Sequence, residues 1–497
     1  MGFIAKQSIK GATANYIGVA LGFFITFFVL TDCLTQAEIG LTRVMVDAAM
    51  LFSALAQIGS NSSIMRFFPR FKDGTGANHG IFGLSLLIPL AGFVLFAVLF
   101  LIFKDSIVGL YIEKSPMIAD YCYLLLPLTF FALYMTVFET NASILQHIAL
   151  PKAVREVGVR AVNLVSYLLY GHGVVSLDVF VMLFVGAYGL AMVVDFVYLL
   201  RLGGISFKID WHFIDRRLAG EMVRYTLFMT ATVLAANIPL INSLFLGAQA
   251  GLALTGVYTI AFYIANIVEV PYRSLGAIAR PVVAEAVGRN DLAETNRLAR
   301  QVSLHQFLVS SMIFCVIWLN LRAMFAVIPN GADYAGGMGV VLLLSVAKIV
   351  NSSLSIATDI LNFSRRYAYS LIFIALLTVS AIVLNRKLIP LWSINGSAAA
   401  TLCSYALYFG GLLLYLWFTY GVSLFAAGHL KVLAIMAAVL AADWLWNFAL
   451  GGAMRIVAGS LLKTLVLGSA ALAAVYFWRV SPTVNEAVDK ALRRKKA

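Results

Sequence analysis

The chain has 497 residues, of which 62% are hydrophobic and only 12% are charged. This composition excludes soluble globular proteins and predicts an all-α polytopic membrane protein. The formal net charge of +13 would suit a nucleic-acid-binding protein, but an excess of Lys and Arg in the cytoplasmic loops of a membrane protein gives the same value.

Apolar segments long enough to cross a bilayer recur along the whole chain. They predict about 14 transmembrane helices, at residues 13–31, 41–64, 80–103, 117–140, 157–170, 177–200, 222–247, 254–278, 302–328, 338–361, 367–389, 396–420, 430–450 and 456–478. When both termini are placed in the cytoplasm, most of the 36 Lys and Arg residues fall on the inner side. Because the positive-inside rule predicts this asymmetry, the charge indicates topology and no nucleic-acid partner.

A segment of the first half has a weak copy in the second half. Residues 40–72 begin with glycine, continue as an apolar span and end in a segment rich in Arg and Pro. Residues 256–285 follow the same plan 216 positions later (256 − 40). Repeats of this kind are typical of transporters built from two homologous halves.

The repeat and the span count together predict the domain organisation. Six spans form an N-terminal lobe, a polar cytoplasmic connector follows, and six more spans form a second, pseudo-symmetric lobe. Two additional helices and a basic cytoplasmic tail complete the chain. The predicted boundaries are 1–200, 201–221, 222–420, 421–480 and 481–497.

The second predicted span carries its strongly polar groups on one narrow stripe. Arg43 and Asp47 start this stripe, which continues at steps of three and four residues to Gln57 and Asn61. A polar stripe does not face lipid, so these groups face protein or a cavity. Arg43 is a candidate substrate-binding cation, but it lies only about one turn below the outer surface, which favours a snorkelling guanidinium paired locally with Asp47.

Lys348 is the clearest ionisable residue inside a predicted span. Ser352, Ser355 and Asp359 follow it at i+4, i+7 and i+11, and Asn351 lies beside this polar edge. A charge at the centre of a bilayer costs on the order of 3 kcal/mol, so it faces a cavity or pairs with another charge. We therefore weigh an anion-binding lysine against a structural ion pair with a carboxylate of a neighbouring helix.

Further polar groups lie near prolines in the seventh and eighth predicted spans. Glu269 comes two residues before Pro271 and is a candidate for ion coupling, or for charge balance with Lys348. Asp47 and Asp359 are further candidates for the same roles. Asn237 precedes Pro239, and Tyr258 shares an edge of the helix with Glu269, so both are candidate substrate-binding groups.

The sequence has no signature of an enzyme. It contains no Walker lysine in a glycine loop and no G-x-S-x-G motif, and its four cysteines have neither metal nor redox spacing. We expect no catalytic residues, no metal and no cofactor. Uphill transport by this chain therefore requires an ion gradient, a partner or a reaction that removes the product.

At this point the chain resembles a known family. KQSIKGATANYIGVALGFF, followed by AEIGLTRVMVDAAMLFSALAQIGSNSSIMRFFPRF, resembles the start of the Wzx-type polysaccharide flippases of the multidrug/oligosaccharidyl-lipid/polysaccharide superfamily. The resemblance implies a V-shaped, two-lobed transporter in the bacterial inner membrane. Its implied cargo is an undecaprenyl-pyrophosphate-linked oligosaccharide, moved to the periplasmic leaflet for assembly of O-antigen, capsule or exopolysaccharide.

The same resemblance implies further properties of the protein. Its expected partners are the lipid-linked glycan, membrane lipids and polysaccharide polymerase or assembly proteins, and it is expected to act as a monomer by alternating access. On this interpretation Lys348 is the first candidate to bind the pyrophosphate and Arg43 is the second, with Asn351 and Ser352 as polar neighbours.

Three alternatives remain. The lipid II flippases share the fourteen-span plan but resemble a pattern with arginines in the first span, whereas residues 11–30 here contain none. Multidrug exporters of the superfamily often carry an acidic residue within the first span, whereas the first carboxylate here is Asp32, at its outer edge. A membrane scaffold is the third alternative, and a buried Lys348 argues against it.

Overall fold

The computed structural model describes residues 3–73, 78–203, 206–446, 453–482, 485–486 and 489. The described part is almost entirely helical and contains no strand, so the prediction of an all-α chain is confirmed. Most of the predicted basic tail, 481–497, lies outside the described residues.

The α-helices of the described part are α1 (Phe3–Phe24), α2 (Leu30–Cys33), α3 (Gln36–Ala56), α4 (Ser60–Phe71), α5 (Ile81–Gly109), α6 (Met117–Tyr121), α7 (Leu125–Ile144), α8 (Ala149–Ala153), α9 (Val159–Gly171), α10 (Leu177–Leu202), α11 (Arg216–Ala236), α12 (Ile241–Gln249), α13 (Leu252–Asn266), α14 (Val270–Gly288), α15 (Leu292–Val327), α16 (Gly331–Tyr334), α17 (Met338–Phe363), α18 (Ser370–Tyr420), α19 (Ala427–Leu445) and α20 (Ala453–Phe477). Two π-helical turns, η1 (Ile25–Val29) and η4 (Val154–Gly158), interrupt them. Six short 3₁₀ segments join others: η2 (Asn78–Gly80), η3 (Cys122–Leu124), η5 (Ile238–Leu240), η6 (Ile267–Glu269), η7 (Ala335–Gly337) and η8 (Tyr367–Tyr369).

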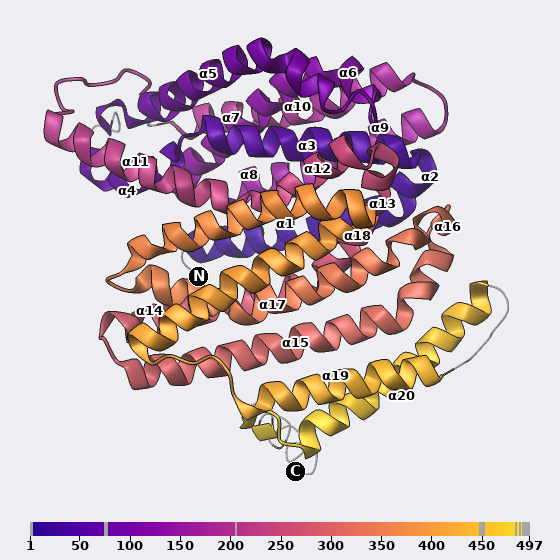
Figure 1. Cartoon of the computed structure of the whole chain (residues 1–497). Helices are drawn as coiled ribbons and strands as arrows, with labels where there is room; N and C mark the ends of the chain where they lie inside the picture. The colour runs from indigo at the N-terminus through magenta and orange to yellow at the C-terminus, as the bar shows by residue number, and fades with distance from the viewer. Residues whose placement is uncertain are drawn as a thin grey trace. The chain divides into compact units, whose positions relative to one another are not determined.

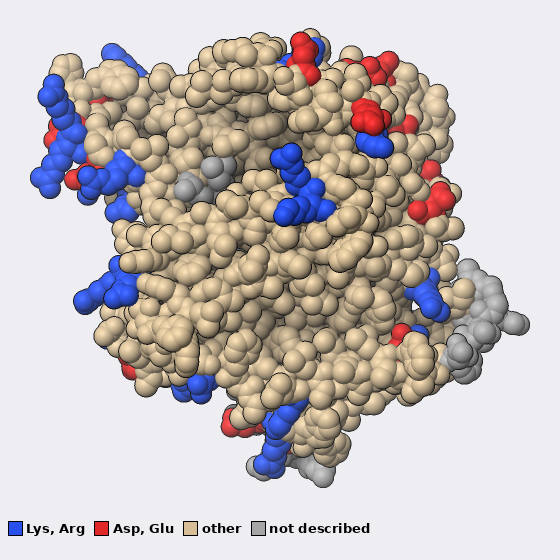
Figure 2. Space-filling model, viewed as in Figure 1, with Lys and Arg blue, Asp and Glu red and all other residues tan. Residues whose placement is uncertain are grey.

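Eleven helical segments of the described chain are long and apolar enough to cross a membrane. They are Thr13–Cys33, Gln36–Ala56, Asn78–Gly109, Met117–Ile144, Leu177–Leu202, Leu252–Glu269, Leu292–Val327, Gly331–Phe363, Tyr367–Tyr420, Ala427–Leu445 and Ile456–Phe477. The chain is therefore a multi-pass membrane protein. Figure 2 agrees, because most of the face it shows belongs to neither acidic nor basic residues.

Two predicted spans are not among these segments, and one segment covers two predicted spans. The span predicted at 157–170 lies in a helical stretch that carries several charges, and the span predicted at 222–247 is divided between α11 and α12 by η5. The 54-residue segment Tyr367–Tyr420 covers the spans predicted at 367–389 and 396–420. Its helix is broken at Ser393, where φ is 50° and ψ is −130°.

The second predicted span, 41–64, has different bounds in the structure. Its helix begins at Gln36, because Thr35 and Glu38 form a capping box in which each side chain accepts a hydrogen bond from the other's backbone N–H. It ends at Ala56, before Ile58 and Gly59 adopt left-handed φ values of 50° and 63°. The polar stripe therefore ends with Gln57, and Asn61 belongs to the next helix, α4.

The structure consists of two compact units, residues 1–259 and 260–497, which divide within α13 and not at the predicted connector. In the first unit, α3 packs against α5, α7 and α12. In the second unit, α17 packs against α14, α15 and α18 (Figure 1). Each unit thus has one buried central helix, and these two helices carry the candidate residues Arg43 and Lys348.

The order of helices in the first half recurs in the second. Helices α3, α4, α5 and α7 are followed by α13, α14, α15 and α17 in the same order. Helix α3 begins at Gln36 and α13 at Leu252, a spacing of 216 residues (252 − 36), equal to that of the sequence repeat. The helix order therefore supports two pseudo-symmetric halves.

The start of α3 crosses the start of α13 at two glycines within the first unit. A β-carbon added to Gly40 would lie 2.0 Å from the carbonyl oxygen of Leu252, and one added to Gly256 would lie 2.0 Å from the carbonyl oxygen of Gln36. Only glycine permits so close an approach of one helix to the backbone of another.

The polar stretch after α10 packs along the loop between α4 and α5, also within the first unit. The His79 ring stacks on Phe213, with centroids 3.8 Å apart, and its Nδ1 lies 3.0 Å from a carboxylate oxygen of Asp210. A β-carbon on Gly80 would lie 2.1 Å from the carbonyl oxygen of Lys208. The stretch predicted as a connector is thus fixed to the first unit by a stacked ring, a hydrogen bond between side chains and close backbone packing.

Candidate functional site

Helix α17 places a lysine in the interior of the second unit. Its apolar residues Leu344, Ala347 and Ile349 are all buried, which fixes the helix against its neighbours. Lys348 lies near the middle of the helix and is 8% exposed as a residue. A buried ammonium at this position requires a partner, because the surrounding apolar side chains cannot replace its hydration.

That partner is Glu269. The Lys348 Nζ donates to Oε2 of Glu269 at 2.6 Å, and Nδ2 of Asn351 donates to Oε1 of the same carboxylate at 2.5 Å. The two side chains of the ion pair are 10% and 14% exposed. The carboxylate is therefore held by two donors from adjacent turns of α17, one on each oxygen.

Glu269 lies where the helix is interrupted. Helix α13 ends at Asn266, the 3₁₀ turn η6 follows, and α14 begins at Val270 directly after Glu269. The carboxylate is thus at the N-terminus of α14, where the helix dipole favours negative charge. Short 3₁₀ stretches between helical segments are also frequent sites of bending.

An aromatic ring adds to the surroundings of the lysine. The Nζ of Lys348 lies 5.5 Å from the ring centroid of Phe262, on the last turns of α13. At this distance the face of the ring attracts a cation. The ammonium is thus stabilised by a carboxylate and by an aromatic face.

A second ion pair joins α14 to α17 further along both helices. Arg280 Nε donates to Oδ2 of Asp359 at 3.1 Å, and Arg280 Nη2 donates to the hydroxyl of Tyr272 at 2.7 Å. Asp359 lies eleven residues after Lys348, and Arg280 lies eleven residues after Glu269 (359 − 348 and 280 − 269). The two helices therefore run in the same direction and share two ion pairs of opposite polarity, about 16 Å apart along the helix axis.

The serines of the predicted polar edge contact other partners. The Ser352 hydroxyl is fully buried and lies 2.9 Å from the hydroxyl of Ser310 on α15. The Ser355 hydroxyl donates to the carbonyl oxygen of Ser352 in its own helix. These contacts place Ser352 on the side of α17 that packs against α15, while Asn351 is held on Glu269.

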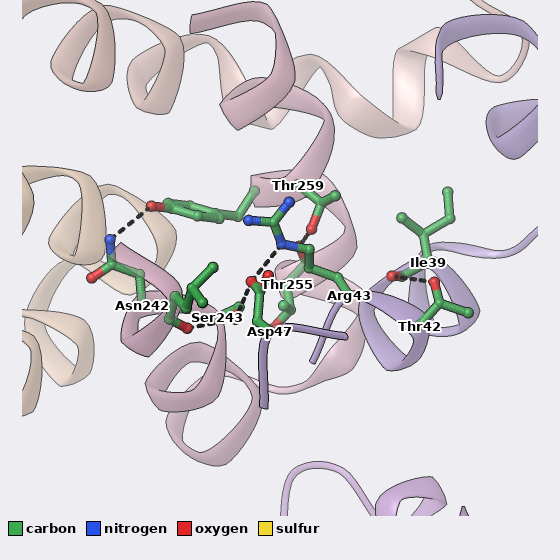
Figure 3. Close-up of polar contacts among 10 residues, drawn as sticks. Ile39, Thr42, Arg43, Asp47, Asn242, Ser243, Thr255 and Thr259 are labelled. Atoms are coloured by element: carbon green, nitrogen blue, oxygen red, sulfur yellow. Dashed lines mark hydrogen bonds and ion pairs between the residues drawn. The ribbon is translucent and has the colours of Figure 1, made fainter. Parts of the chain in front are cut away.

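The first unit has its own buried ion pair on α3. Arg43 Nε donates to Oδ2 of Asp47 at 2.6 Å, as expected for a local i, i+4 pair, so that expectation is confirmed. The Ser243 hydroxyl of α12 donates to the same oxygen at 2.6 Å. Figure 3 shows the Asp47 carboxylate between the Arg43 guanidinium and Ser243. Asp47 is 3% exposed and so connects α3 to α12 inside the unit.

Tyr258 and Asn237, the remaining candidates, also lie in the first unit. Tyr258 is 2% exposed as a residue, and its hydroxyl accepts a hydrogen bond from Nδ2 of Asn242 at 3.4 Å. Asn237 Nδ2 donates to the carbonyl oxygen of Val233 at 2.8 Å, which closes the end of α11. The structure thus brings together Lys348, Asn351 and Glu269 on one hand, and Arg43 and Asp47 on the other.

Three contributors were missed by reasoning from the sequence. Phe262 and Ser243 carry no signal that distinguishes them from other apolar or small polar residues of a span. Arg280 did carry a signal in the sequence. It follows Glu269 by eleven residues, as Asp359 follows Lys348, with the charges in the opposite order. That matching interval could have predicted α14 and α17 as paired helices.

No family model and no curated protein matches the chain at significance. Among solved structures, the lipid II flippase MurJ in an inward closed conformation is similar, with a TM-score of 0.73 and 12% identity over 95% of this chain and 100% of that chain. A multidrug resistance MATE family transporter of the MOP superfamily gives a TM-score of 0.58 and 16% identity over 85% of this chain and 94% of that chain. A MOP superfamily transporter from Pyrococcus furiosus, described as having a binding pocket of reversed polarity, gives a TM-score of 0.54 and 14% identity over 88% of this chain and 97% of that chain. The chain therefore has the fold of these flippases and transporters.

Proposed function

We propose that the protein is a flippase that moves an undecaprenyl-pyrophosphate-linked oligosaccharide from the cytoplasmic to the periplasmic leaflet of the bacterial inner membrane. The glycan is a repeat unit for surface polysaccharide such as O-antigen, capsule or exopolysaccharide, as the resemblance to Wzx-type flippases implies. The transporter has cytoplasmic termini and works as a monomer beside polymerase or assembly proteins. Transport proceeds by alternating access and is driven by an ion gradient or by removal of the product.

The observation that carries this proposal is the buried Lys348 on the central helix of a transporter fold. A diphosphate head group needs cations and hydrogen-bond donors inside the membrane. Lys348 supplies a cation and Asn351, one turn further along the helix, supplies an amide donor. The lipid tail of such a cargo can remain in the bilayer, so that only the head group has to be enclosed.

The structural likeness covers a lipid II flippase and multidrug transporters alike, so the feature that favours a lipid-linked cargo over a drug is the first carboxylate, Asp32, which lies only at the outer edge of the first predicted span. The similar lipid II flippase is matched over its whole length, with a TM-score of 0.73, while the similar MATE family transporter reaches 0.58. This match makes lipid II the second candidate cargo. The absence of arginine between residues 11 and 30 is the feature that favours another lipid-linked glycan.

The experiment is to delete the gene in its host and to measure surface glycan and undecaprenyl-diphosphate oligosaccharides of the membrane by mass spectrometry. The proposal predicts that repeat-unit lipid accumulates and surface glycan disappears, and that a plasmid copy restores both. Accumulation of lipid II would establish the second candidate. Unchanged lipid pools together with increased drug sensitivity would overturn the proposal in favour of drug export.

A further inference from the structure

We propose that Glu269 occupies the cargo's anion site, and that the phosphate of the cargo displaces it from Lys348 and Asn351. This inference rests on the proposed function, because it concerns how the same residues bind the head group. It assigns to Glu269 the role of an internal competitor, whose negative charge sets the affinity of the site for anions.

The geometry of the donors supports a site for an anion with two oxygens on one central atom. Lys348 Nζ and Asn351 Nδ2 each hold one oxygen of a single carboxylate, at 2.6 Å and 2.5 Å. Two oxygens of a phosphate have nearly the same separation as those of a carboxylate, so the two donors can bind either group in the same way. Charge-assisted bonds of this kind are the strong ones in proteins.

The position of Glu269 supports its release. The residue ends the 3₁₀ turn η6 and precedes the first residue of α14, so it lies at an interruption of the helix and not within regular turns. About one seventh of its side chain is exposed. A change of backbone angles at this interruption can withdraw the carboxylate while the remainder of α14 stays helical.

The second ion pair between these helices keeps α14 in place when the first one opens. Arg280 and Asp359 join the helices eleven residues further along, and Tyr272 holds the same guanidinium. The end of α14 near Glu269 can therefore move about a fixed contact. Lys348 does not remain unpaired, because the incoming phosphate replaces one negative charge with another.

The test uses inorganic pyrophosphate as the probe and the full-length protein in detergent. Glu269→Gln keeps the size of the side chain and removes its charge, so we expect this variant to bind pyrophosphate at least tenfold more tightly than the wild type by titration calorimetry. The gain must vanish in Glu269→Gln/Lys348→Gln. Equal affinity of wild type and Glu269→Gln, or a gain that survives in the double variant, would overturn the inference.

Asp443→Asn is the matched control. Asp443 pairs with Lys463, and the two side chains are 19% and 18% exposed, close to the values of the pair at the site. In the described part of the chain no second side-chain donor holds the Asp443 carboxylate, so this substitution frees a lysine without creating a two-donor site. A tenfold gain in this control would also overturn the inference, because it would show that any freed lysine binds the probe.

A second measurement covers the case in which Glu269→Gln is too unstable for calorimetry, since the substitution leaves a buried lysine without its carboxylate. Pyrophosphate should then raise its unfolding temperature more than that of the wild type, and sodium chloride of equal ionic strength should not. If pyrophosphate does not raise the unfolding temperature of the variant more than that of the wild type, the inference is overturned. The proposed function is tested separately by the lipid pools of the deletion strain, so that either proposal can fail while the other stands.

Discussion

Gly40 and Gly256 face each other's helices at one crossing, where each would place an added β-carbon 2.0 Å from a carbonyl oxygen of the other helix. The oxygens belong to Gln36 and Leu252, each four residues before the glycine of its own helix. The crossing is therefore symmetric in its local contacts. This symmetry appears in the sequence only as the spacing of 216 residues.

Either glycine replaced by alanine should destabilise the protein to a similar degree. The added methyl group meets rigid backbone, so the helices must separate, at a cost of about 1–3 kcal/mol for overpacking. The thermal unfolding temperature of the purified variants measures this loss. Because one separation of the helices relieves both clashes, the double variant should lose less than the sum of the two. Gly186→Ala, on α10 where no atom outside the helix's own backbone lies within 4 Å of the added β-carbon, should not lower the unfolding temperature, since alanine without a clash favours the helix.

Lys348→Ala should abolish export and also lower stability, since it leaves the Glu269 carboxylate without its ammonium partner. Loss of one member of a buried pair costs about 3–5 kcal/mol. The double variant Lys348→Met/Glu269→Met removes both charges at similar side-chain volume and should recover most of the unfolding temperature, but no export of surface glycan. Export restored in the stable double variant would show that the pair is structural and has no part in transport.

Ser243→Ala and Asp47→Ala should each destabilise the first unit, and their effects should not add. The hydroxyl of Ser243 and the guanidinium of Arg43 share one carboxylate oxygen of Asp47. A hydrogen bond to a charged group contributes about 1.5–3 kcal/mol. A double-mutant cycle of unfolding free energies should therefore give a coupling of at least about 0.5 kcal/mol, and a coupling of zero would refute a direct bond.

Asp210→Asn and Phe213→Ala should each loosen the stretch between α10 and α11. The hydrogen bond with His79 is the main reason that the pKa of Asp210 lies below its ordinary value. A carboxyl whose pKa is lowered by folding stabilises the folded form above its ordinary pKa of about 4, and this contribution is lost as the pH falls through the lowered value. The protection of residues 206–213 against hydrogen exchange, corrected for the intrinsic pH dependence of amide exchange and measured between pH 3 and pH 7, should thus be high at neutral pH and should fall only at the acid end.

In Asp210→Asn the same exchange should already be faster at pH 7, since the ionised partner of His79 is absent. Phe213→Ala should have this effect at every pH, because it removes the stacked ring and no titrating group. Exchange in Asp210→Asn equal to that of the wild type at pH 7 would mean that the contact between His79 and the Asp210 carboxylate does not hold this stretch.

Composition and periodicity predicted the membrane class, the helical fold and the i, i+4 pair of Arg43 and Asp47, because each depends on local sequence. The break at Ile58 and Gly59 escaped prediction since the apolar run continues across it, and hydropathy carries no record of backbone angle. The capping box of Thr35 and Glu38 was visible in the sequence and could have placed the start of α3 correctly.

The partner of Lys348 could be proposed from the sequence but not fixed. Glu269 lies 79 residues away (348 − 269), and a charge in a span indicates only that some partner or cavity exists. Which carboxylate reaches it depends on how α14 packs against α17. Ser352 illustrates the same limit, because its step of four from Lys348 does not determine whether it faces Glu269 or α15.

The opposite polarity of the two ion pairs between α14 and α17 has an electrical consequence. Glu269 and Arg280 contribute one negative and one positive charge from the first helix, and Lys348 and Asp359 contribute the reverse from the second. Moving one elementary charge through a membrane potential of 100 mV changes the free energy by about 2.3 kcal/mol. A rearrangement that carries these four residues together therefore moves no net charge of theirs through that potential, whereas withdrawal of Glu269 alone moves one negative charge.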